Sequence, residues 1–266
     1  MEMFVMRVIA IATIGEYVDE IYKISKKWDL GDGDIWYRGV DKARPLVPRL
    51  IWRKAPDEGS LIDEFSIHYP SITSQRCQDS WELYTLMQHY GLPTRLLDWT
   101  RSPLIALYFA LEKPPEKRSR TAATIYAMDP FALNESTYGL ESIVIPYGHR
   151  KTYEGIPLDG YLPVTLRDTD AKGPELPLAI EPALINRRIQ FQQGCFTIHG
   201  TGRQPIDKYL NGKHRDRIVR FVVNRREGHE RLQADLRYLG FRREMIYQDL
   251  DRLTSRIVDS YLTDSR

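Results

Sequence analysis

Residues 88–103 read QHYGLPTRLLDWTRSP, and this stretch decides the fold because it joins two helical patterns through one extended segment. The preceding residues 79–90 place their apolar side chains on one helical face, and Gly91 stands where a helix C-cap is expected. Residues 94–99 then predict an extended segment. The stretch therefore predicts a helix, a strand and a second helix in succession.

That second helix is expected to begin at Ser102 and Pro103, because serine is favoured at the N-cap and proline at the first helical position. Residues 104–111, LIALYFAL, are apolar on every side, which predicts a buried helix. Near the N-terminus, Thr13 and Glu16 have the spacing of a capping box. The other expected elements are strands at 35–39, 122–128, 195–199 and 217–223, and helices at 14–28, 60–69, 182–191 and, in two pieces, 225–262.

Residues 134–178 are rich in glycine, proline and polar residues and lack a strong hydrophobic period. A loop of that length inside a compact domain is often functional or a lid. No linker composition and no internal repeat divides the chain. We therefore expect a single α+β domain over residues 1–266, with a helical C-terminal part at 225–262.

The composition is ordinary for a globular protein, with 42% hydrophobic and 28% charged residues. The longest apolar stretches fall short of the roughly 18 residues that a membrane-spanning helix needs. The acidic Glu2 before the first apolar run does not fit a secretory signal. Cys77 and Cys195 are too few for a disulfide framework and form no CxxC pair. We expect a cytoplasmic protein with no membrane partner and no metal.

Residues 88–103 also place many polar side chains between two helices that are expected to be buried. Burying such groups costs several kcal/mol unless hydrogen-bond partners are supplied. One interpretation is a binding pocket with residues 94–99 as its floor. The alternative is a satisfied internal network, with Arg95 paired to Asp98 or another acid and His89 hydrogen-bonded to a carbonyl. The sequence does not decide between them.

Arg38 is the second candidate, because it lies in the middle of the aromatic segment IWYRG, residues 35–39. A guanidinium there is costly to bury without a carboxylate or phosphate to receive its hydrogen bonds. Gly39 allows the backbone to approach a ligand closely or to turn sharply. A structural pair of Arg38 with Asp98 is the alternative.

Tyr37-Arg38-Gly39 together with residues 88–110 resembles the FRG domain family, which is named for a Phe-Arg-Gly motif. The similarity is strong over roughly residues 30–130, and residues 188–197, RIQFQQGCFT, are similar to a weaker motif near the family's C-terminal end. The resemblance implies an ADP-ribosyltransferase-like fold, in which a split β-sheet with flanking helices holds NAD across a cleft.

In that fold Arg38 would grip the diphosphate of NAD, Thr100 and Ser102 would hold ribose or nicotinamide, and Gln192 would orient the reacting ribose. The resemblance implies Arg38, Thr100 and Gln192 as the catalytic set. It implies further contacts to NAD from a surrounding group, in which Tyr37 or Tyr108 could stack on the nicotinamide ring: Tyr37, Arg38, Gly39, His89, Arg95, Asp98, Ser102 and Tyr108.

The late motif departs from many such transferases, which use a glutamate where this chain has Gln192 and Gln193. A glutamine bears no charge with which to stabilise an oxocarbenium-like transition state. We therefore weigh an NAD-dependent ADP-ribosyltransferase or NAD glycohydrolase, of the kind found in bacterial toxins and phage-defence effectors, against a non-catalytic nucleotide sensor or adaptor.

The acceptor of an ADP-ribose group would be a protein, a nucleic acid or water. Residues 201–266 hold 15 Lys or Arg against 10 Asp or Glu. This mildly basic part suggests nucleic-acid binding as a third hypothesis, although a solvated helix face explains the charges as well.

Overall fold

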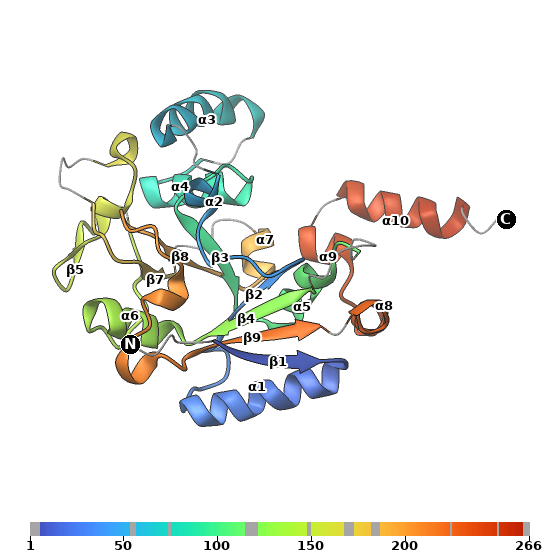
Figure 1. The fold of residues 1–266 in the computed structure, drawn as a ribbon. Helices are drawn as coiled ribbons and strands as arrows, with labels where there is room; N and C mark the ends of the chain where they lie inside the picture. The colour runs from blue at the N-terminus through green and yellow to red at the C-terminus, as the bar shows by residue number, and fades with distance from the viewer. Residues whose placement is uncertain are drawn as a thin grey trace.

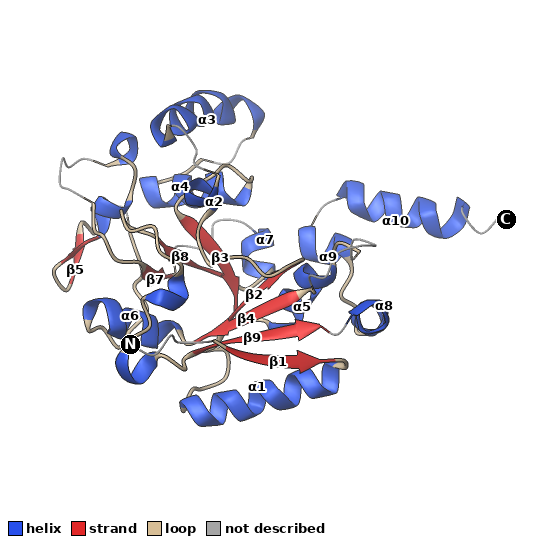
Figure 2. Cartoon of the chain, viewed as in Figure 1, coloured by secondary structure: helices blue, strands red, loops and turns tan. Residues whose placement is uncertain are grey.

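The structure is a computed structural model, and it describes residues 6–53, 57–73, 76–114, 122–147, 150–167, 173–181, 187–223, 225–248 and 250–262. It confirms an α+β fold (Figures 1 and 2). Seven strands form one sheet, in the order β1-β9-β4-β2-β3-β8-β7. Their bounds are β1 Arg7–Ile11, β2 Trp36–Val40, β3 Leu96–Thr100, β4 Thr124–Met128, β7 Leu178–Ile180, β8 Gly194–Ile198 and β9 Ile218–Val223.

The sheet is weakly joined in its middle, between β2 and β3. Five residue pairs connect β2 to β4, and five connect β3 to β8, but the single pair Tyr37 and Thr100 connects β2 to β3. Within the described sheet, the strands β1, β9, β4 and β2 thus form one half and β3, β8 and β7 the other. The two halves separate beyond that pair.

Ten α-helices accompany the sheet in the described part of the chain. Their bounds are α1 Ile14–Trp28, α2 Arg49–Trp52, α3 Glu58–Ile72, α4 Ser80–His89, α5 Pro103–Leu111, α6 Pro130–Tyr138, α7 Arg187–Phe191, α8 Arg225–Tyr238, α9 Arg243–Tyr247 and α10 Leu250–Leu262. Helices α1, α5 and α8 share a hydrophobic core with strands β2, β4 and β9. In Figure 1, α1 lies along β1 while α3 and α4 lie at the opposite end, over β3.

The local signals in the sequence account for several helix ends. Thr13 and Glu16 make both hydrogen bonds of a capping box at the start of α1, as predicted. The Ser102 hydroxyl accepts a hydrogen bond from the backbone N–H of Ile105, and Pro103 begins α5. The predicted helix 14–28 and the central strands agree with the structure, whereas the first half of the predicted helix 182–191 lies outside the described residues.

The segment 134–178 differs from the expected loop or lid. Helix α6 occupies its beginning, a hairpin of β5 (Thr152–Tyr153) and β6 (Ile156–Pro157) follows, and β7 ends it. Its apolar side chains pack with α3, α4, β7 and β8 in a second core, to which Val144, Leu158 and Tyr161 contribute fully buried side chains. The described part of the segment is therefore core structure, because its apolar residues meet the second half of the sheet.

Strand β1 was not predicted either. Its five residues pair in parallel with β9, which lies about 200 residues further along the chain.

No helix of the described chain is both long enough and apolar enough to cross a membrane.

Candidate functional site

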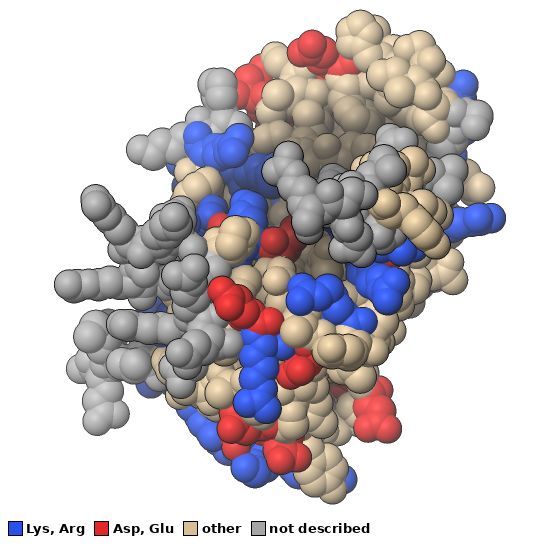
Figure 3. Space-filling view, turned by 90° about the vertical axis from the view of Figure 1, so that its right-hand side faces the viewer, with Lys and Arg blue, Asp and Glu red and all other residues tan. Residues whose placement is uncertain are grey.

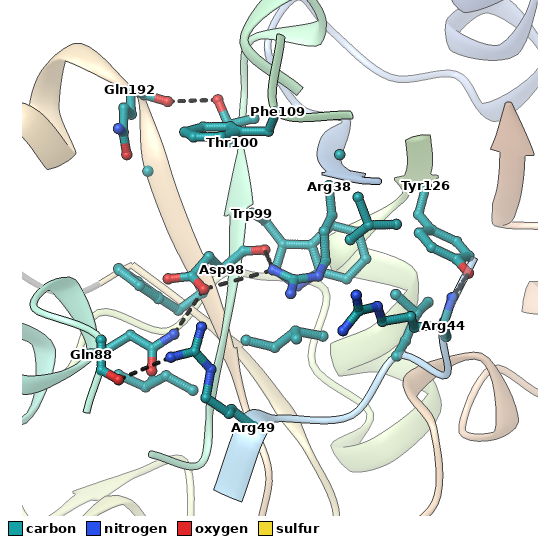
Figure 4. A pocket seen from close by; sticks show the side chains of 18 of the residues that line it. Arg38, Arg44, Arg49, Gln88, Asp98, Trp99, Thr100, Phe109, Tyr126 and Gln192 are labelled. Atoms are coloured by element: carbon teal, nitrogen blue, oxygen red, sulfur yellow. Dashed lines mark hydrogen bonds and ion pairs between the residues drawn. The ribbon is translucent and has the colours of Figure 1, made fainter. Parts of the chain in front are cut away.

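A cavity of about 590 Å³ lies where β2 and β3 separate (Figure 4). Both halves of the sheet contribute to its lining, together with α2, the segment before α2, and the ends of α4, α5 and α7. Seven of the predicted site residues line it: Tyr37, Arg38, Gly39, His89, Asp98, Thr100 and Gln192. As far as the described residues form it, the lining does not include Arg95, Ser102 or Tyr108.

Arg38 connects the two strands across this opening. Its Nη1 donates a hydrogen bond of 2.6 Å to the backbone carbonyl of Asp98 and lies 3.7 Å from the Asp98 carboxylate. Its side chain remains 25% exposed. Burial lowers the pKa of Arg38, the carboxylate of Asp98 opposes this, and the nearby Arg49 charge lowers it further. The guanidinium is thus partly compensated and still open to the cavity.

Asp98 belongs to a chain of polar contacts that begins at Thr94. The Thr94 hydroxyl donates to the side-chain oxygen of Gln88 at 2.6 Å. The Gln88 amide nitrogen donates in turn to the Asp98 carboxylate at 2.7 Å (Figure 4). The Asp98 side chain is 55% exposed. These contacts satisfy much of the polar stretch internally, while Asp98 stays accessible from the cavity.

Arg95 does not line the cavity, although it was among the predicted ligand contacts. Its Nε donates to the Glu58 carboxylate at 2.8 Å, and its Nη2 contacts the same oxygen. The Tyr84 hydroxyl donates to Glu58 and accepts from the backbone N–H of Arg95. The alternative interpretation, Arg95 paired with another acid, is therefore the correct one for this residue. The pair holds β3 to α3 and α4.

Gly39 has a packing role that was not predicted. A Cβ atom at this position would lie 1.8 Å from the backbone oxygen of Ala106 and 2.8 Å from the backbone nitrogen of Ala110. Both atoms belong to α5, so only glycine lets this helix lie directly on β2. The glycine of the Tyr-Arg-Gly motif thus positions α5, and with it the side chain of Phe109 at the cavity.

Thr100 and Gln192 line the cavity, but their polar groups are already engaged. The Thr100 hydroxyl donates to the backbone carbonyl of Gln192 at 2.6 Å and accepts from the backbone N–H of Ser102 at 3.0 Å. The Gln192 amide nitrogen donates to the backbone carbonyl of Ile246 at 2.9 Å. These bonds tie the end of β3 to the late motif and to α9. Ser102 caps α5 instead of contacting the cavity.

The remaining predicted contacts differ in their environment. His89 lines the cavity, and burial, followed by the charge of Arg188, lowers its pKa to about 4. Its imidazole is therefore neutral near pH 7. Tyr37 is buried in the core beneath α5, which raises the pKa of its hydroxyl. Tyr108 packs against the same core, where its ring meets that of Phe109 edge-on.

The segment between β2 and α3 contributes cavity residues that the sequence analysis missed. Arg44, Arg49 and Trp52 all line the cavity, and Figure 4 shows Arg44 and Arg49 extending into it beside Arg38. The available signal was that two arginines, Arg44 and Arg49, and a tryptophan, Trp52, follow Tyr37-Arg38-Gly39 closely in the sequence. They follow no helical or strand period, so pattern analysis did not single them out.

The cavity lining is cationic well beyond the protein as a whole. Opposite charges are nearly balanced over the chain, whose formal net charge is +2. The lining carries six basic side chains against three acidic ones; they are Arg38, Arg44, Arg49, Arg53, Lys113 and Arg188 against Asp41, Asp98 and Glu112. Such an excess in a concave site raises the local concentration of anionic ligands.

Comparison with known proteins gives one match. The FRG domain model matches residues 33–119, a range that contains β2, α4, β3 and α5. No curated protein and no solved structure matches the chain. The matched range supplies Arg38, Asp98 and Arg49 of α2 to the cavity, and residues 33–119 of this chain are an FRG domain.

Proposed function

We propose that this protein binds NAD in the cavity between β2 and β3 and cleaves its nicotinamide–ribosyl bond, passing ADP-ribose to a macromolecule or to water. The observation that carries the proposal is the open cationic cavity into which Arg38 extends at the separation of the sheet. A dinucleotide carries a diphosphate, and guanidinium groups bind phosphate oxygens with paired hydrogen bonds.

Two further features support NAD over a simpler anion. The sheet is joined by one residue pair at the cavity, an arrangement that resembles the split sheet of ADP-ribosyltransferase-like folds. Phe109, Trp52 and Trp99 add aromatic lining beside the cations. A site with both kinds of side chain suits a ligand that has charged phosphates and flat rings.

The proposed reaction breaks the bond between the ribose C1′ and the nicotinamide nitrogen. Nicotinamide leaves as a neutral molecule, and the positive charge passes to the ribose, where an acceptor hydroxyl or water attacks C1′ and loses a proton. Because Gln192 is uncharged and bonded to Ile246, the stabilising charge would have to come from a carboxylate. Asp98 is the acidic residue that lies on β3 beside Arg38.

Release of nicotinamide tests this activity directly. Purified protein is incubated with NAD, with and without cell lysate as a source of acceptors, and free nicotinamide is measured by chromatography. We expect release by the unaltered protein and its loss in Arg38→Ala. The matched control is Arg7→Ala, which removes an exposed arginine on β1 that pairs with Glu20. Equal release by the unaltered and Arg38→Ala proteins would refute the proposal.

A nucleotide sensor without turnover is the second candidate. It is favoured because two of the three predicted catalytic side chains, those of Thr100 and Gln192, are already bonded to the backbone. Thermal unfolding in the presence of NAD separates the two functions, since a ligand that binds the folded state raises the unfolding temperature. A large shift without nicotinamide release would establish the sensor.

The predicted roles as a toxin or phage-defence effector are compatible with either candidate and stay predictions. Nucleic-acid binding by the basic C-terminal part is less well supported. On the face drawn in Figure 3, the Lys and Arg side chains that can be seen lie among Asp and Glu side chains. Such mixing weakens phosphate binding.

A further inference from the structure

We propose that Arg44 and Trp52 form a subsite for the base and the adjoining phosphate of a nucleoside diphosphate, on the part of the cavity that the segment between β2 and α3 lines. The proposal rests on the proposed function, because it names the ligand class and the contacts of the same cavity. In this proposal, the segment between β2 and α3 makes the cavity bind a nucleotide more tightly than an inorganic phosphate.

The Arg44 side chain is held in place, but not all of its hydrogen-bond donors have partners among the described residues. Its Nη2 donates to the Asp41 carboxylate at 3.1 Å, and its backbone N–H and carbonyl both contact the Tyr126 hydroxyl. Its Nε is buried and has no hydrogen-bond partner among the described residues. An unsatisfied buried donor on a charged group is costly. That nitrogen is closed to a ligand, but the Arg44 side chain as a whole is 36% exposed, and the guanidinium that extends into the cavity in Figure 4 can donate to a phosphate oxygen there.

Trp52 differs from the other tryptophans of the chain in its exposure. It is 53% exposed, whereas the other four, Trp28, Trp36, Trp81 and Trp99, are each at most 3% exposed. The Arg44 guanidinium carbon lies 5.3 Å from the centre of the Trp52 ring, a cation–π contact that fixes the indole beside the cavity. Its accessible ring surface can receive a flat base, as aromatic side chains do in nucleotide-binding proteins.

The charges around this subsite favour a ligand in which the base is joined to a diphosphate. Arg49 donates to the backbone carbonyl of Gly91 at 3.0 Å, which holds α2 close to the end of α4. Arg38 and Arg49 both line the cavity, and the charge of Arg49 adds, after the larger effect of burial, to the lowering of the Arg38 pKa. An anion between the arginines offsets this effect of the Arg49 charge. A diphosphate next to Arg44 would place its attached nucleoside within reach of Trp52.

The test is a calorimetric comparison of two ligands, ADP and inorganic pyrophosphate, on the full chain. ADP has no nicotinamide bond, so the result does not depend on turnover. The variants are Trp52→Ala, Trp52→Phe and Arg44→Ala, with Arg7→Ala as the control. Thermal unfolding checks that each variant is folded. In the unaltered protein, quenching of the exposed Trp52 fluorescence by ADP gives a second readout.

We expect ADP to bind about tenfold more tightly than pyrophosphate, because stacking on an aromatic ring contributes that much. Trp52→Ala should abolish this preference and leave pyrophosphate affinity unchanged, while Trp52→Phe should retain most of it. Arg44→Ala should weaken both ligands about tenfold, as expected for loss of a charged hydrogen bond.

The inference is overturned if Trp52→Ala keeps the preference for ADP, if Arg44→Ala binds both ligands normally, or if neither ligand binds. These outcomes are separable from the failure of the proposed activity. Binding of ADP with the expected pattern, but no nicotinamide release from NAD, would refute catalysis alone. Nicotinamide release together with an unchanged preference in Trp52→Ala would refute the subsite alone.

Discussion

Arg38 contacts the backbone of Asp98 more closely than its carboxylate: Nη1 lies 2.6 Å from the Asp98 carbonyl oxygen and 3.7 Å from the carboxylate. The carboxylate is meanwhile held by the Gln88 amide at 2.7 Å. Arg38 therefore bridges the separation of the sheet through a neutral group. Its charge is only partly balanced by the protein, which leaves the guanidinium available to an anion in the cavity.

Asp98→Asn should separate anion binding from catalysis. Removing the negative charge beside Arg38 should tighten the binding of inorganic pyrophosphate several-fold, because the arginine no longer interacts with an acid. Nicotinamide release should fall at least about a hundredfold if Asp98 stabilises the transition state. Calorimetry and the release assay measure the two effects. Weaker pyrophosphate binding, or unchanged release, would contradict the role given to Asp98.

Gly39→Ala should destabilise the fold by about 3 kcal/mol, at the upper end of the range for overpacking. The new methyl group would overlap the backbone of α5 at Ala106, and a helix backbone cannot give way as a side chain can. Chemical denaturation measures the loss. Gly15→Ala is the matched control, since its added Cβ meets its nearest atom, the Thr13 hydroxyl oxygen, at 3.9 Å; it should leave stability unchanged or raise it. Equal stability of both variants would show that α5 does not require the glycine.

Arg95→Ala should lower stability by about 3 kcal/mol, because it leaves the mostly buried Glu58 carboxylate without its cation. Ligand affinity should change little in the folded protein, since Arg95 does not line the cavity in the described structure. The double variant Arg95→Ala with Glu58→Gln should recover part of the loss. A large loss of NAD affinity at unchanged stability would instead return Arg95 to the binding site.

His89 should titrate with a pKa of about 4, which NMR of the imidazole signals can follow. The folded pKa lies below the unfolded value of about 6.5, so the unfolded state binds more protons between these values. Stability from this group is therefore present above about pH 6.5 and is lost as the pH falls toward 4. His89→Gln should reduce that acid sensitivity. A His89 pKa near 6.5 would mean that the ring is not buried as described.

The sequence predicted the centre of the fold because its signals there are local. The apolar helix 103–111, its Ser102 cap and the strands on either side depend on neighbouring residues alone. Strand β1 and the segment 134–178 could not be predicted in the same way. Their apolar residues acquire a role only through partners far along the chain, such as β9 for β1.

The residues of the candidate site show the same difference between local signals and roles that depend on distant parts of the chain. Arg38 and Asp98 stood out because charged residues among aromatic or apolar neighbours are unusual. Arg95 gave the same signal, and only the structure shows that its guanidinium pairs with the Glu58 carboxylate. Arg44 and Trp52 carried no periodic signal, and their importance follows from the way the chain turns back over β2 and β3.

The most direct test of the central claim is a calorimetric titration of NAD into the unaltered protein and into Arg38→Gln. The glutamine removes the charge but ends two bonds short of the position of Nη1, so the hydrogen bond to the Asp98 carbonyl is lost as well, and thermal unfolding must show that the variant is folded. We predict saturable binding by the unaltered protein and binding at least about tenfold weaker by Arg38→Gln. Equal affinities in the two folded proteins, or no binding by the unaltered one, would contradict the claim that Arg38 receives the phosphates of a nucleotide.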